Sequence, residues 1–195
     1  MPVKRVGIDF DNTIVCYDEV FSRLAAERAL MPPGEPVTKG RLRDHLRAQG
    51  REDVWTALQG EAYGPALRYA KPFLGVLEFI ARCRKKGVPV SIISHKTLHP
   101  FLGPKHDLHQ AARSWLTANG LSDVETFLEL TKQEKLERIG SAGCGYFIDD
   151  LPEFLGEPGF PQGIERILFA PDGAREPSTF KIARCWADIE KWILS

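Results

Sequence analysis

The stretch Val6-Gly7-Ile8-Asp9-Phe10-Asp11-Asn12-Thr13 runs from apolar residues directly into two carboxylates. The apolar residues predict a buried strand, and burying acids at its end is costly unless the acids have a function. In an extended chain Asp9 and Asp11 point to the same side. Because open α/β sheets bind ligands at the carboxyl ends of their strands, the stretch predicts a ligand site at this end.

Two acids held this close repel each other, so they either share a proton or hold a cation between them. Oxygen ligands favour a hard cation, and Mg²⁺ is preferred where a substrate adds phosphate oxygens. One acid could then attack phosphorus while the other transfers a proton. A simpler alternative is that Asp11-Asn12-Thr13 caps the next helix or forms an Asx turn.

The length and composition of the chain limit the possible protein classes. The 195 residues suffice for one well-buried domain with a modest insertion. The chain has 26 basic residues (Lys plus Arg) and 26 acidic residues (Asp plus Glu), so its net charge is zero. No overall electrostatic attraction therefore favours a nucleic acid polymer or an acidic membrane as a partner. The 4 cysteines are scattered without a Cys-x-x-Cys pair, as is typical of reduced thiols. Since no long apolar span occurs, we expect a cytoplasmic protein.

Short apolar runs alternate with amphipathic helical stretches, a pattern that predicts an α/β fold with a parallel sheet. A helix is expected over residues 74–86. The interval 15–71 is too long for a crossover and has apolar residues at helical spacing, so it is predicted to be a small helical cap. The core domain is then expected to comprise residues 1–14 and 72–195. The expected strands cover residues 5–10, 88–94, 125–130, 145–148 and 166–170, with a sixth near 181–184.

Polar residues follow two further predicted strands. In Val90-Ser91-Ile92-Ile93-Ser94-His95-Lys96-Thr97 an apolar strand delivers the hydroxyl of Ser94 to its carboxyl edge, where it could hold a phosphoryl oxygen. In Gly145-Tyr146-Phe147-Ile148-Asp149-Asp150 another apolar strand ends in paired acids. Asp149 and Asp150 would complete an oxygen shell for magnesium.

A lysine is expected close to these acids. Thr131 and Glu134 form a capping-box pattern, so a helix is predicted to begin after Thr131 and to carry Lys132 and Lys135 in its first turns. An ammonium group fixed near the carboxylates would offset both their charge and the charge of a phosphate. The spacing alone leaves open which lysine has this position.

In their order along the chain, Asp-x-Asp-x-Thr at residues 9–13, Ser94, the lysine and Asp149-Asp150 resemble the motifs of the haloacid dehalogenase (HAD) superfamily, phosphatase-like branch with a small helical (C1-type) cap. The resemblance covers nearly the whole chain outside the cap. It implies a Rossmann-like (HAD-like) doubly wound parallel sheet with the cap inserted after the first strand. Leu130 is followed almost at once by Lys132, which leaves no room for a large second cap there.

The resemblance also implies a role for each residue. Asp9 would be the nucleophile that forms an aspartyl-phosphate, and Asp11 the acid that protonates the leaving oxygen and later activates water. Dehalogenases of the superfamily lack this second Asp and act on carbon, so an acid at position 11 implies a reaction at phosphorus. The implied magnesium ligands are Asp9, the backbone carbonyl of Asp11, Asp149 and Asp150. The phosphate would be held by Ser94, His95 and either Lys135, which we favour, or Lys132, while Thr13 supports the first loop.

The expected function is therefore hydrolysis of a small phosphorylated metabolite with Mg²⁺ as cofactor. Two alternatives remain: a catalytically quiet phosphate- or sugar-phosphate-binding protein on the same fold, and a phosphotransferase or phosphomutase. A receiver-type signalling domain has similar residues, but its lysine follows its acids. The histidines 95, 99, 106 and 109 fit no standard zinc motif. The identity of the substrate and the oligomeric state are not readable from the sequence.

Overall fold

The computed structural model describes residues 4–32, 34, 37–173 and 180–195. The chain forms two compact units. The first, which we call the sheet unit, comprises Met1–Val15, Pro72–His95 and Asp123–Ser195. The second, the helical unit, comprises Cys16–Lys71 and Lys96–Ser122. The predicted division, 1–14 and 72–195 against 15–71, differs from these units in the segment that follows His95.

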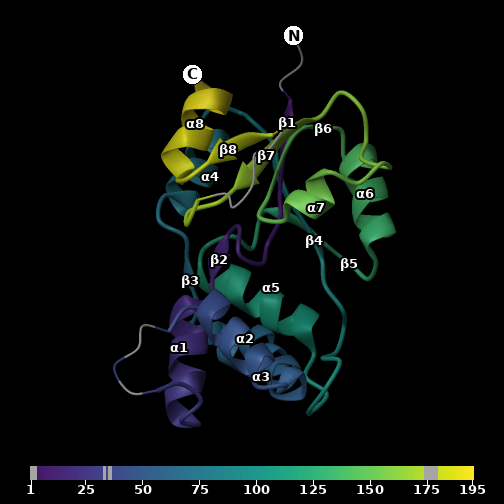
Figure 1. Ribbon diagram of the computed structural model, residues 1–195. Helices are drawn as coiled ribbons and strands as arrows, with labels where there is room; N and C mark the ends of the chain where they lie inside the picture. Colours follow the sequence, from purple (N-terminus) through teal and green to yellow (C-terminus); the bar gives the residue numbers. More distant parts are fainter. Residues whose placement is uncertain (1–3, 33, 35–36, 174–179) are drawn as a thin grey trace. The chain divides into compact units, whose positions relative to one another are not determined.

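The sheet unit contains a six-stranded parallel sheet with the order β5-β4-β1-β6-β7-β8 (Figure 1). Strand β1 is central, and its Ile8 is in register with Ile92 of β4 and Ile148 of β6. Each predicted strand is confirmed to within two residues, because buried apolar runs with short bounding turns are a strong local signal. The strands are β1 (Arg5–Ile8), β4 (Val90–His95), β5 (Glu125–Glu129), β6 (Cys144–Asp149), β7 (Glu165–Phe169) and β8 (Lys181–Ala183).

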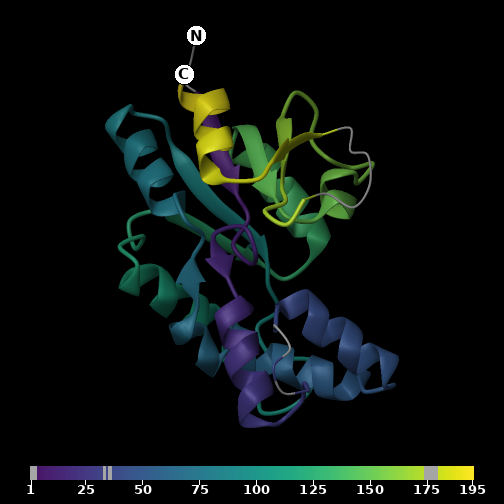
Figure 2. The ribbon, with the colours of Figure 1, turned by 60° about the vertical axis from the view of Figure 1, so that its left-hand side comes forward.

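Helices cover both faces of this sheet. On one side α4 (Val76–Lys85) and α8 (Trp186–Leu194) lie next to each other, as Figure 1 and Figure 2 show, with the Phe79 and Trp186 rings 5.2 Å apart. On the other side are α6 (Lys132–Ser141) and α7 (Pro152–Leu155), which pack on a buried cluster that includes Phe147. A doubly wound α/β fold is therefore confirmed.

The helical unit contains four α-helices and a short 3₁₀ helix among its described residues, and its core is aromatic. Phe21 stacks on Trp55 with ring centroids 5.0 Å apart, and the indole N–H of Trp115 donates to the carbonyl of Ala70 at 2.8 Å. This last bond ties the segment after β4 to the segment before β3. The elements are α1 (Asp18–Glu27), α2 (Lys39–Ala48), α3 (Glu52–Tyr63), η1 (Pro65–Tyr69) and α5 (Leu108–Ala118).

Two short strands, β2 (Val15–Cys16) and β3 (Lys71–Pro72), form a separate two-stranded sheet, and the division between the units falls inside both. The first stretch of the chain thus enters the inserted helices directly after β2. Among the helices that the structure describes, none combines the length and apolar character needed to span a bilayer.

Gly7 of β1 allows the central strands to pack closely. A Cβ atom at this position would lie 2.6 Å from a ring carbon of Phe147 and 2.9 Å from the sulfur of Cys144. We expect Gly7→Ala to lower the free energy of unfolding by about 1–3 kcal/mol through overpacking, measured by urea denaturation. A Cβ atom on Gly40 of α2 would meet no other atom within 4 Å, so Gly40→Ala should instead raise stability by about 0.5–1 kcal/mol. Equal stability of Gly7→Ala and the native protein would contradict this account of β1.

Candidate active site

Asp9 is fixed at the carboxyl end of the central strand. It follows the last residue of β1, and its backbone N–H donates to the carbonyl of Ile148 at 2.9 Å, which continues the hydrogen bonding between β1 and β6. The residue is only 5 % exposed. The β1 backbone therefore holds this carboxylate beside the end of β6, where the second pair of acids lies.

A tight turn follows Asp9. The carbonyl of Phe10 accepts from the N–H groups of both Ile14 and Val15 at 3.1 Å, and Asn12 has a φ of 59°, in the left-handed region that Asn tolerates. The next helix, α1, begins at Asp18 with Tyr17 as its N-cap. The alternative in which Asp11-Asn12-Thr13 caps that helix is therefore wrong.

The other predicted residues of this turn differ in burial. Asp11 is partly buried, and its backbone forms an isolated parallel β-bridge with that of Val15. Thr13 is fully buried, and its hydroxyl has no hydrogen-bond partner among the residues that the structure describes. Thr13 thus lies inside the loop, which suits a supporting residue better than one that contacts a substrate.

Strand β4 brings Ser94 and His95 to the same edge of the sheet. Ser94 is buried, whereas His95 is exposed and its Nε2 lies 3.1 Å from the carbonyl oxygen of Leu130. Partial burial lowers the pKa of His95, and the bond to Leu130 opposes this shift only in part. His95 is therefore mostly neutral near pH 7 and offers a phosphate little positive charge, and its single N–H, on Nε2, donates to the carbonyl of Leu130.

Helix α6 begins where the capping box predicts. The Thr131 hydroxyl accepts from the Glu134 N–H at 3.1 Å, and the Glu134 carboxylate accepts from the Thr131 N–H at 2.9 Å. The two candidate lysines differ sharply. The Lys132 side chain is 52 % exposed and lies 4.0 Å from Glu157, whereas the Lys135 side chain is 4 % exposed.

Lys135 joins the two buried acids. Its Nζ donates to Oδ1 of Asp9 at 2.6 Å and to Oδ2 of Asp149 at 2.7 Å, and it lies 4.1 Å from the centre of the Phe154 ring. Burial alone would lower the pKa of Lys135, but the two carboxylates raise it above its usual value. The lysine therefore stays charged and neutralises part of the buried negative charge.

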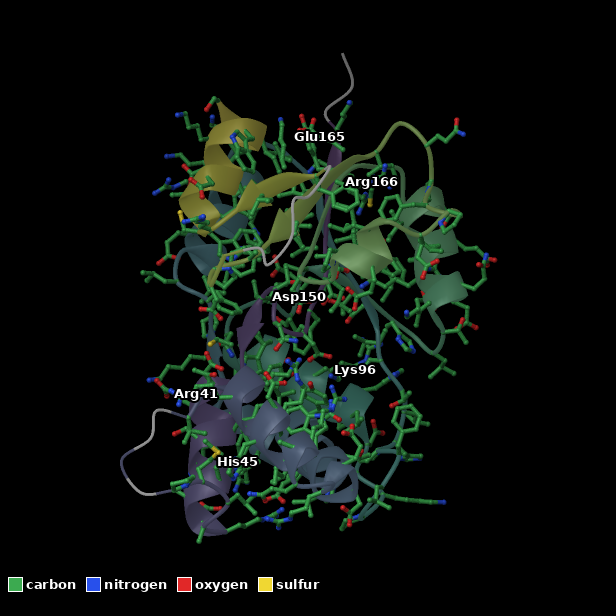
Figure 3. All side chains as sticks on the ribbon, in the orientation of Figure 1. Arg41, His45, Lys96, Asp150, Glu165 and Arg166 are labelled. Carbon is green, nitrogen blue, oxygen red and sulfur yellow. The ribbon has the colours of Figure 1, made fainter. Side chains whose placement is uncertain are left out.

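The acids at the end of β6 complete the cluster. Oδ1 of Asp149 accepts from the N–H of Leu151 at 2.9 Å, which orients this fully buried carboxylate. Asp9, Asp149 and Asp150 each offer an oxygen, and these oxygens lie within 4.8 Å of one another; Figure 3 labels Asp150. A purely oxygen donor set of this size fits a hard divalent cation such as Mg²⁺.

Asp9 is electrostatically strained without such a cation. Burial raises its pKa to about 7; Lys135 opposes the shift and the neighbouring Asp149 adds to it. At neutral pH a cation-free Asp9 is thus partly protonated, and a protonated carboxyl is a poor nucleophile. Positive charge beside the cluster favours the ionised form that nucleophilic chemistry needs.

The remaining histidines do not form a metal site in the described residues. His99 Nδ1 lies 3.0 Å from the carbonyl oxygen of His106, and His109 Nε2 lies 2.7 Å from that of Lys96. The metal-capable group found in the described ranges consists of the three aspartates alone.

Lys96 is a buried residue that the sequence did not identify as a site candidate; it is only 4 % exposed. Its position two residues after Ser94 was the one feature of the sequence that pointed to it.

Comparison with known proteins identifies the fold. No protein-family model matches the chain, and no curated protein matches it. Solved structures do match over full length. YfnB from Bacillus subtilis, a HAD hydrolase bound to magnesium, is 14% identical, with 99% of each chain covered and a TM-score of 0.61. A predicted phosphoglycolate phosphatase from Haemophilus somnus is 16% identical, with 98% of each covered and a TM-score of 0.59.

The L-2-haloacid dehalogenase RSc1362 is 13% identical, with 100% of each chain covered and a TM-score of 0.59. The chain has the HAD-superfamily hydrolase fold. The matched structures include both a predicted phosphatase and a dehalogenase at the same TM-score, so the fold alone does not separate reactions at phosphorus from reactions at carbon.

The unequal burial of the two lysines gives a direct test. Lys135→Met removes the ammonium between two buried carboxylates, so we expect the free energy of unfolding to fall by about 3–5 kcal/mol. Lys132→Met removes an exposed charge and should change it by less than about 0.5 kcal/mol. Urea denaturation of both variants at pH 7.5 measures the difference. Equal effects would contradict the buried ion cluster.

The raised pKa of Asp9 predicts how stability depends on pH in the presence of chelator. The folded state keeps a proton up to about pH 7 that the unfolded state loses near its ordinary value of 3.8. Stability from this group is fully present below pH 4 and is lost as pH rises towards 7. We expect a loss on the order of 2–4 kcal/mol, absent in Asp9→Asn. Excess Mg²⁺ should reduce the loss, and the exposed control Asp123→Asn should keep it. A native profile that matches that of Asp9→Asn would contradict the shift.

Proposed function

We propose that the protein is a magnesium-dependent phosphomonoester hydrolase that acts on a small phosphorylated metabolite through an aspartyl-phosphate on Asp9. The observation that carries this proposal is the buried group of Asp9, Lys135 and Asp149 at the carboxyl end of the central strand, with contacts of 2.6 and 2.7 Å. Such a group supports the proposal because it would supply a nucleophile, a fixed cation and metal ligands within one site.

In the first step a carboxylate oxygen of Asp9 forms a bond to phosphorus while the bond from phosphorus to the ester oxygen breaks. Asp11 gives its proton to that leaving oxygen. In the second step Asp11 takes a proton from water, whose oxygen attacks phosphorus, and the bond between Asp9 and phosphorus breaks. The products are an alcohol and inorganic phosphate, and both acids return to their starting state.

Other residues bind and orient the phosphoryl group. Lys135 holds Asp9 in place by its 2.6 Å bond and offsets negative charge. Ser94, at the end of β4, is proposed to donate to a phosphoryl oxygen, and His95 to do so through the Nε2–H that otherwise donates to the carbonyl of Leu130. Mg²⁺ bound by Asp9, Asp149 and Asp150, with the Asp11 carbonyl, would supply positive charge against the transferred group. We assign no contact with phosphate to Lys132, whose side chain is 52 % exposed.

The proposed setting is the cytoplasm, with a small molecule as substrate and neither a nucleic acid nor a membrane as partner. The balance of 26 basic against 26 acidic residues supports this. The cysteines are free thiols, and burial raises the pKa of Cys144 to about 11 and that of Cys83 to about 12. Such thiols are protonated and unreactive at neutral pH.

Phosphate release from a panel of phosphomonoesters, including a chromogenic aryl phosphate, tests the function. We expect release with Mg²⁺, none with chelator and none from Asp9→Asn. Asp11→Asn should lower kcat by about 10²–10⁴-fold, because it removes general acid–base catalysis. Asp123→Asn, which removes an exposed acid, is the matched control and should keep full activity.

A parallel assay of halide release from L-2-haloacids separates hydrolysis at phosphorus from dehalogenation. Halide release without phosphate release would overturn the proposal. Phosphate transfer to an added alcohol in preference to water would replace hydrolase by phosphotransferase. No turnover of any ester by folded protein that binds Mg²⁺ would indicate a quiet phosphate-binding protein.

A further inference from the structure

Helix α5, labelled in Figure 1, lines a groove that lies wholly within the helical unit. The groove has a volume of about 500 Å³. Its other lining residues come from the end of α3, from η1 and from the loop that precedes α5. Ligand pockets of proteins commonly have volumes of about 300–1,000 Å³, so the groove is large enough for a small molecule.

The groove is elongated, and apolar side chains line its middle part. Gln110 near the start of α5 and Asn119 at its end both line it, so this side extends for about 13.5 Å along the helix axis. The indole N–H of Trp115 donates to the carbonyl of Ala70 at 2.8 Å, which fixes the largest ring of the lining. This shape and surface suit an elongated apolar molecule. The apolar lining residues are Pro65, Ala111, Trp115 and Ala118.

Positive charge predominates among the side chains that line the groove. Besides His106, its titratable lining residues are Arg68, Lys105 and Asp107, an excess of one positive charge. Asp107 is the N-cap of α5 and accepts from the N–H of Gln110 at 2.8 Å. Its negative charge therefore already interacts with the positive end of the α5 dipole, and the two basic side chains can attract an anion.

Neither basic side chain forms an ion pair with another residue that the structure describes. Arg68 instead donates to the hydroxyl of Tyr69 at 2.7 Å, and its Cζ lies 4.7 Å from the centre of that ring. These contacts orient the guanidinium without a carboxylate beside it. Lys105 is exposed to solvent. Both cations can therefore pair with an anionic group in the groove without breaking an existing ion pair.

We propose that this groove is a binding site for an elongated small molecule with an apolar body and one carboxylate, as in a medium-chain fatty acid. The apolar body lies along α5, and the carboxylate pairs with Arg68, Lys105 or both. An excess of one positive charge matches a singly charged head group better than a phosphate dianion. Because the groove contains no residue of the sheet unit, this proposal is independent of the proposed phosphatase function.

Ligands that differ in head group or in chain length test both parts of the proposal. Calorimetric titration of the whole protein should show about tenfold tighter binding of decanoate than of decyltrimethylammonium, which has the same chain and the opposite charge. Decanoate should also bind about tenfold more tightly than butyrate, which has a shorter apolar chain. No binding of decanoate, or equal affinity for decanoate and either comparison ligand, would overturn the proposal.

A pair of tryptophan variants locates the bound chain. Ala118 and Thr117 are both exposed residues of α5, and only Ala118 lines the groove. Ala118→Trp fills part of the groove, so it should weaken decanoate binding by about tenfold through steric exclusion. Thr117→Trp adds the same ring outside the groove and should leave the affinity unchanged. Equal effects of the two substitutions would show that decanoate binds elsewhere.

Charge variants locate the carboxylate. Arg68→Met combined with Lys105→Met should remove most of the preference for decanoate over decyltrimethylammonium, whereas Arg68→Lys combined with Lys105→Arg should keep part of it. Arg113→Met is the matched control, because Arg113 is an exposed residue of α5 that does not line the groove. This variant should keep the preference. A loss of the preference in Arg113→Met as large as in the double Met variant would overturn the proposal, since only a general electrostatic attraction would then be acting.

Discussion

The buried ion cluster of Lys135 with Asp9 and Asp149 is the interaction on which the site depends. It joins the end of β1, the end of β6 and the second turn of α6, at distances of 2.6 and 2.7 Å. Removing Lys135 leaves two buried carboxylates without their counter-charge, so the three elements are held in one arrangement by this lysine. The same interaction that fixes α6 on the sheet also fixes the proposed nucleophile, so stability and the proposed reactivity depend on one set of atoms.

The cluster is not electrically complete by itself. Three carboxylates lie within 4.8 Å of one another, and one buried ammonium bonds to two of them. Burial therefore raises the pKa of Asp9 to about 7, although Lys135 opposes the shift. An isolated Asp in such a place becomes an acid rather than a nucleophile near neutral pH. The chemistry and the divalent-cation binding that we propose for this site thus have one electrostatic origin.

Local patterns predicted most of the sheet unit. The alternation of buried strands, the capping box at Thr131 and the acids at strand ends all depend on residues close in sequence. The choice between Lys132 and Lys135 could not be made this way, because both lie on one side of α6. Burial of Lys135 with Leu136 and Ile139 is set by how the helix lies on the sheet.

Contacts between residues distant in sequence also placed the segment Lys96–Ser122 in the helical unit. In this segment the indole N–H of Trp115 donates to the carbonyl of Ala70, 45 residues away in the chain. A lysine that follows a strand is usually exposed, so the burial of Lys96 and its contact with Tyr63 could not be predicted from the sequence.

The fold leaves the reaction undecided, since a predicted phosphatase and a dehalogenase match it with the same TM-score of 0.59. The decision therefore rests on side chains, and Asp11 is the informative one. Displacement at an ester oxygen produces an alkoxide that needs a proton, whereas a halide leaves as a stable anion and needs none. Protonation of the leaving group by an acid two residues after the proposed nucleophile is needed only in the first case. Its presence beside Asp9 is the chemical reason to favour phosphorus over carbon.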